Sequence, residues 1–141
     1  MAENKDRSLA THYLNVDLDV YSTYDLRPLV DSLGREVLAL YVGPERRRYC
    51  AHLEVAKMTK TADSTILAFC KLIHSLPKET RGLWNRATLR SSSIGVQAGN
   101  RPTSCDFAIQ ATTVKAVSEV AAQIVLTVYA PRESTQLQDA S

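Results

Sequence analysis

The sequence predicts an α+β fold in which one mixed, mainly antiparallel sheet carries helices on a single face. Several segments alternate apolar and polar residues, as half-buried strands do. Between them, apolar residues recur at three- and four-residue spacing, which is typical of amphipathic helices. The 141 residues, 45% of them hydrophobic and 23% charged, suffice for one core without a disulfide or a metal. We expect one domain at 12–130 between flexible segments at 1–11 and 131–141.

The first half of the chain predicts a strand, a helix and a hairpin of two strands. Strict alternation begins at residue 12. The expected buried face of this first strand consists of Leu14, Val16, Leu18 and Val20. A helix at 25–34 has suitable capping residues at both ends. Strands follow at 37–42 and 48–56, and a turn at 43–45 joins them.

The second half predicts three helical segments and three further strands. The helical segments are 63–73, 78–87 and 112–121, and the strands are 94–98, 104–110 and 124–130. Alternation places Cys105 and Phe107 on the buried face of the strand at 104–110. In the last strand we expect Leu126 to join the core.

This order resembles a known arrangement at the level of the fold. A strand, a helix, two strands, helical segments and a further strand match the split βαβ, or ferredoxin-like, order. The remaining elements would extend the same sheet by a further βαβ unit. Because this fold hosts enzymes, regulatory modules and nucleic-acid binders alike, the resemblance does not select a function.

The polar faces of the first and third strands offer one candidate site. If the third strand lies between the first two, Asp17 and Asp19 come to neighbour His52 and Glu54. These four residues are candidates for acid–base chemistry, and Asp17, Asp19 and Glu54 are candidates for holding a metal ion. The alternative is an ordinary solvated sheet face with cross-strand pairs. On the same face, Cys50 is the thiol expected to point outward.

Basic residues supply candidates for contact with a partner. They are Arg46, Arg47 and Arg48 at the hairpin, and Lys78, Arg81 and Arg86 in the second helical segment. Such a surface steers an acidic partner, although the second group is explained better by a solvated helix face whose side-chain stems cover Trp84. We do not expect a nucleic-acid partner, because the first strand presents carboxylates that repel phosphates.

The sequence lacks the motifs of several enzyme classes. It contains no glycine-rich nucleotide loop, no Walker loop and no His-Glu-x-x-His. Its three cysteines form no Cys-x-x-Cys pair, which favours a reducing compartment, and no secretory signal or membrane span is recognisable. We therefore expect a cytoplasmic binding or regulatory domain without a cofactor, which binds a protein partner, a second copy or a small ligand. The alternative is a metal-dependent or acid–base enzyme that uses the polar sheet face.

Overall fold

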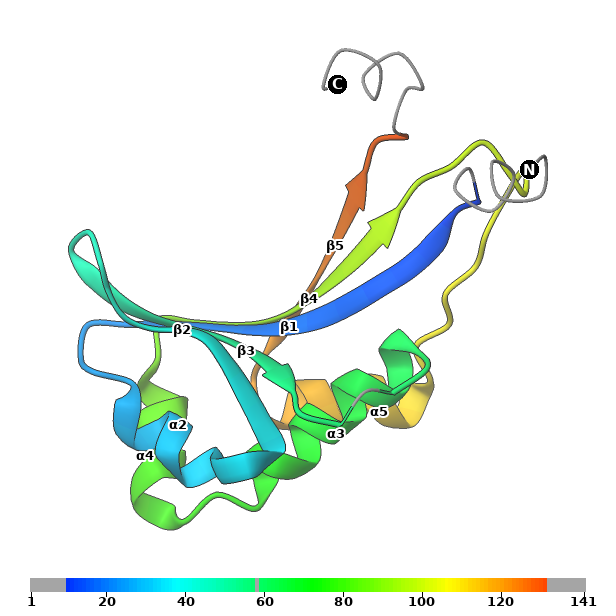
Figure 1. The fold of residues 1–141 in the computed structure, drawn as a ribbon. Helices are drawn as coiled ribbons and strands as arrows, with labels where there is room; N and C mark the ends of the chain where they lie inside the picture. Colours follow the sequence, from blue (N-terminus) through cyan, green and yellow to red (C-terminus); the bar gives the residue numbers. More distant parts are fainter. Residues whose placement is uncertain (1–9, 58, 132–141) are drawn as a thin grey trace.

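The computed structural model describes residues 10–57 and 59–131, and within them it confirms the α+β class. One mixed sheet of five strands is accompanied by four α-helices (Figure 1). The segments 1–9 and 132–141, where the flexible ends were expected, lie outside the described residues. None of the described helices is both long enough and apolar enough to cross a bilayer.

The elements follow the expected order with one exception. They are β1 (His12–Ser22), α2 (Arg27–Leu33), a 3₁₀ turn (Gly34–Glu36), β2 (Val37–Glu45), β3 (Arg48–Val55), α3 (Ala62–His74), α4 (Lys78–Arg86), β4 (Leu89–Gln97), α5 (Ala111–Glu119) and β5 (Gln123–Tyr129). The sheet order is β2-β3-β1-β4-β5. The third strand, β3, lies between β2 and β1 and is antiparallel to both, while β4 pairs antiparallel with the other side of β1.

The exception is the strand expected at 104–110, which is wrong. This segment is an extended loop without a strand partner. It leaves the end of β4 and runs back toward the helices (Figure 1), where the Gln110 N–H donates to the Asp63 carboxylate at 2.7 Å. The extension of the sheet therefore reuses β4: α5 crosses over and returns as β5, parallel to β4.

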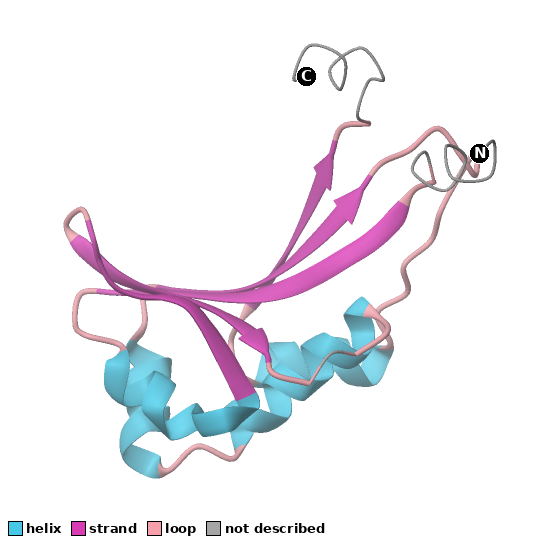
Figure 2. Cartoon of the chain, viewed as in Figure 1, coloured by secondary structure: helices cyan, strands magenta, loops and turns pink. Residues whose placement is uncertain are grey.

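The helices lie on one side of the sheet, and the core fills the space between (Figure 2). The largest fully buried side chains come from the sheet and from all four helices, with Thr113 as the contribution of α5. They include Val16, Leu18, Val20, Leu29, Leu53, Ile66, Phe69, Ile73 and Trp84. Alternating strand positions and the helical stripes thus meet as their periodicity predicts.

A β-bulge changes the inward face of β1 near its start. Tyr13 pairs with Val96 and Val16 pairs with Ile94, so one extra residue of β1 is accommodated between them. Tyr13 packs against the core, whereas Leu14 is 40% exposed. The expectation that Leu14 is a core residue is therefore wrong.

The outer strand β5 is exposed along its whole length. It rises with the end of β4 away from the helices (Figure 1), and all seven of its residues are exposed. Leu126, expected in the core, is 59% exposed, as this whole outer strand is exposed. The expectation for Leu126 is wrong for that reason.

Candidate functional site

The face of the sheet opposite the helices carries a row of polar side chains across its three central strands. This polar row consists of Asn15, Asp17 and Asp19 on β1, His52 and Glu54 on β3, and Ser93 on β4. In the register of the sheet, Asp19 is opposite His52 and Asp17 is opposite Ser93. The structure therefore brings together all four residues named as acid–base candidates.

Asp19 connects the two sides of the polar row. One of its carboxylate oxygens lies 2.7 Å from Nδ1 of His52, and the other accepts a hydrogen bond from the Ser93 hydroxyl at 2.8 Å. The carboxylate thus stands between the serine and the histidine. A nucleophilic triad needs the histidine in the middle, so Ser93 is not activated by His52 here. Asp19 instead fixes the orientation of the imidazole.

Asn15 connects two further carboxylates of the polar row, Asp17 and Glu54. Its side-chain amide donates to Asp17 and to Glu54, both at 3.1 Å. Partial burial, followed by the nearby charges of Glu54 and Asp19, raises the pKa of Asp17 to about 6. Asp17 therefore takes up a proton in a mildly acidic range in which ordinary aspartates remain ionised.

Replacing Asp17 by asparagine is expected to stabilise the protein by about 1 kcal/mol at pH 8, after allowing for solvent screening. The raised pKa means that the ionised carboxylate costs free energy in the folded state. This cost is complete above about pH 6 and is lost as the pH falls toward 3.8. Urea unfolding of both proteins between pH 3.5 and 8 measures the difference.

The matched control is Asp31→Asn on the exposed surface of α2. It is expected to leave the free energy of unfolding nearly unchanged across the same range. An Asp17→Asn protein that is less stable than the wild type at pH 8 would contradict the raised pKa of Asp17 and the free-energy cost of its ionised form.

The three arginines of the β2–β3 hairpin are exposed. The hairpin turn is formed by Arg46 and Arg47, and Arg48 begins β3. The Arg48 guanidinium stacks 3.9 Å from the ring centre of Tyr21 and lies 3.9 Å from a Glu45 oxygen. Arg48 is therefore engaged on the open sheet face, next to the polar row.

The basic residues of α4 differ in their surroundings. Lys78 and Arg86 are exposed, and the Arg86 guanidinium lies 5.7 Å from the ring centre of Tyr24. Arg81 donates to the carbonyl of Ile73 at 3.3 Å, so it links α4 to the end of α3. Arg81 therefore has a structural contact between two helices, whereas Lys78 and Arg86 remain exposed candidates for a partner.

The cysteines are placed differently from the expectation. Cys50 lies on the open face but is fully buried by its neighbours, and burial raises the pKa of its thiol. Cys105, expected in the core, is exposed because its segment is a loop. Cys50 thus points outward from the helices as expected, but the accompanying expectation of an accessible thiol is wrong.

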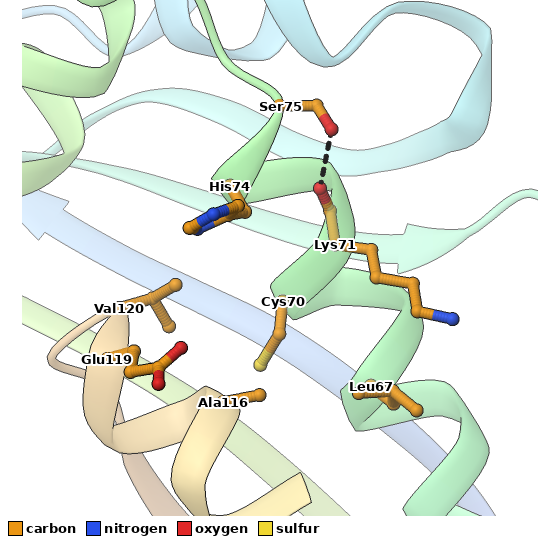
Figure 3. A pocket seen from close by; sticks show the side chains of 8 residues that line it. All are labelled: Leu67, Cys70, Lys71, His74, Ser75, Ala116, Glu119 and Val120. Atoms are coloured by element: carbon orange, nitrogen blue, oxygen red, sulfur yellow. Dashed lines mark hydrogen bonds between the residues drawn. The ribbon is translucent and has the colours of Figure 1, made fainter. Parts of the chain in front are cut away.

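An open groove of about 420 Å³ lies between α3 and α5 (Figure 3). Cys70, His74 and Glu119 are among the eight residues that line it. The only side-chain hydrogen bond among these eight joins Ser75 to the backbone carbonyl of Lys71 at 2.9 Å, at the end of α3. The groove therefore lacks the converging, mutually oriented polar groups that the polar row has.

A second feature is the apolar surface along β5. We define the β5 edge as Ile124, Val125, Leu126, Val128 and Tyr129, which are 36–59% exposed. An edge strand with apolar residues on both faces is unusual, because such strands are normally covered on both faces. The absence of alternation in this segment was the sequence signal for it.

Comparisons of the chain with protein-family models, with curated proteins and with solved structures found no match. The polar row, the β5 edge and the hairpin are therefore the features of the molecule that point to a function.

Proposed function

We propose that the protein is a binding domain that associates with a second copy of itself through the β5 edge. The observation that carries this proposal is the exposure of all seven β5 residues at the open side of the sheet. An edge strand leaves a row of backbone donors and acceptors ready to pair with another strand. No charged residue occurs from Val120 to Pro131, so nothing in the strand repels an identical strand.

Symmetry favours a second copy over an unrelated partner. Two β5 strands related by a twofold axis pair antiparallel, so the same residues meet from both sides and the surface is its own complement. A neutral strand also provides no charge with which to select an acidic or basic partner. The pairing would continue one sheet across both copies.

The opposite edge of the sheet, β2, differs in the features that discourage pairing. It contains a bulge between Ala39 and Tyr41, it includes Pro44, and it ends on the charged Glu45. Bulges, prolines and charges are the usual devices that protect a sheet edge. The seven residues of β5 contain none of them. The contrast supports β5 as the side at which copies meet.

Replacing Leu126 by lysine is expected to weaken self-association at least about tenfold, because a symmetric pair places two like charges near each other. Sedimentation velocity at several concentrations measures the dissociation constant. The control is Leu38→Lys on β2, where a leucine is similarly exposed, at 53% against 59%. Dissociation by the Leu38 variant alone, or equal effects of the two, would overturn the proposal.

We also infer that the first four strands, β1 to β4, form a ferredoxin-like unit, which α5 and β5 extend. The order β2-β3-β1-β4, with helices on one face, supports this name. The three free cysteines support a reducing, cytoplasmic setting.

A metal-dependent or acid–base enzyme is the second candidate function. The oriented Asp19–His52 pair and the raised pKa of Asp17 favour it, because perturbed, mutually oriented titratable groups gather at functional sites. These residues lie on β1 and β3, so the candidate does not depend on the β5 edge.

A further inference from the structure

We propose that Glu45, Cys50 and His52 form a binding site for a divalent transition-metal ion of the zinc class, at the base of the β2–β3 hairpin. The proposal is independent of the β5 edge. It also differs from the metal ligands expected from the sequence, which were Asp17, Asp19 and Glu54. Among the described residues, this is the one group of histidine, cysteine and carboxylate side chains whose potential ligand atoms converge.

The hairpin itself brings the three ligands together. A two-residue turn pairs Glu45 with Arg48, and this register places Gly43 opposite Cys50 and Tyr41 opposite His52. Since side chains alternate along a strand, the side chains of Glu45, Cys50 and His52 share the face away from the helices. One potential ligand atom from each of the three lies within 4.8 Å of the others.

These distances fit a metal ion after a small closing movement. Zinc binds sulfur, nitrogen and oxygen ligands at about 2.0–2.3 Å, so tetrahedral ligands stand roughly 3.5 Å apart. Thiolate, imidazole and carboxylate together are typical of zinc and its neighbours, whereas magnesium and calcium prefer oxygen ligands alone. Three protein ligands leave a fourth position for water or another ligand.

The polar row orients the histidine for this role. Asp19 lies 2.7 Å from Nδ1 of His52, which leaves Nε2 as the ring nitrogen for the metal. Asp19 is itself held by the Ser93 hydroxyl at 2.8 Å. A carboxylate behind a metal-binding histidine fixes its tautomer and raises its basicity. Asp19 is thus a positioning residue, and its presence is an observation separate from the ligand cluster.

The surrounding charges are compatible with a bound cation. Glu45 and Asp19 bring negative charge, and metal binding displaces the proton of the Cys50 thiol. The opposing charge is Arg48, 3.9 Å from Glu45, with a side chain that is 51% exposed. Because its guanidinium stacks on the ring of Tyr21, Arg48 can keep this contact while Glu45 turns to the metal.

Titration of the full chain with Co²⁺ and Zn²⁺ under reducing conditions tests the proposal. We expect one ion per chain by calorimetry, and a thiolate-to-cobalt absorption band with the intense visible bands of a tetrahedral site. Cys50→Ser is expected to abolish the thiolate band, while Cys105→Ser, which changes an exposed cysteine elsewhere, leaves it intact. Glu45→Gln alters an exposed side chain, so it tests the site even if the buried Cys50 variant folds poorly.

Each variant has a distinct expected result. Glu45→Gln and His52→Gln are expected to weaken binding at least about tenfold, and Glu79→Gln, on the exposed surface of α4, to leave it unchanged. Asp19→Asn is expected to weaken binding about 10–100-fold while the cobalt spectrum is retained. Absence of binding by the wild type would overturn the proposal. Binding that survives both Glu45→Gln and His52→Gln, or a thiolate band lost only in Cys105→Ser, would overturn it as well.

Discussion

Replacing Trp84 by alanine is expected to lower the free energy of unfolding by about 3–5 kcal/mol. Trp84 is the only tryptophan of the chain and is fully buried in α4. Its indole N–H donates to the carbonyl of Val120, at the end of α5, at 2.8 Å. The substitution removes the largest buried side chain and leaves that carbonyl without this partner. Urea unfolding followed by circular dichroism measures the loss.

Trp84→Phe separates the two contributions. It keeps an aromatic ring in the core but removes the N–H donor, so we expect a loss of about 1–3 kcal/mol. An alanine variant as stable as the wild type, or no less stable than the phenylalanine variant, would contradict the burial of Trp84 between α4 and the end of α5.

Leu18→Ala and Ile73→Ala are each expected to cost about 2–5 kcal/mol. Leu18 lies on the inward face of the central strand β1, and Ile73 lies on the buried stripe of α3. Both side chains are almost completely buried, and truncation leaves a cavity between sheet and helix. Denaturant midpoints and slopes of the two variants give the values.

Leu14→Ala is the control for these two substitutions. Leu14 is also a leucine of β1, but the bulge leaves it 40% exposed, so we expect a loss below about 1 kcal/mol. A cost equal to that of Leu18→Ala would mean that the inward face of β1 continues unbroken to its start.

Alternation in the sequence predicted most of the sheet, and its failures have physical causes. It placed Val16, Leu18 and Val20 on the core face because a regular pleat repeats every two residues. The same period fails at Leu14, where the bulge adds a residue. It also cannot tell a strand from an extended loop, since 104–110 alternates without a neighbour to pair with.

Strand periodicity and the order of the elements also predicted part of the candidate site. The spacing of Asp17 and Asp19 showed that they share a face, and the order of elements brought His52 beside them. Glu45 was missed because a turn was expected at 43–45, whereas the strands continue to a two-residue turn at 46–47. Burial of Cys50 depends on neighbours from other strands, which local spacing does not reveal.

The exposure of β5 depends on long-range geometry as well. Its composition shows a strand with two apolar faces, but only the assembled fold shows that the helices stop short of it. Within the part of the chain that the structure describes, this apolar strand is uncovered, and for that reason we expect a second copy to cover it.

Amide hydrogen exchange at two protein concentrations tests that central claim most directly. Since β4 occupies only one side of β5, the β5 amides that point away from β4 have no strand partner among residues 10–57 and 59–131. We expect these amides to exchange quickly in dilute solution and to become protected as the concentration rises, while the outer amides of β2 stay unchanged. Exchange of the β5 amides that is fast at every concentration would contradict pairing through this strand.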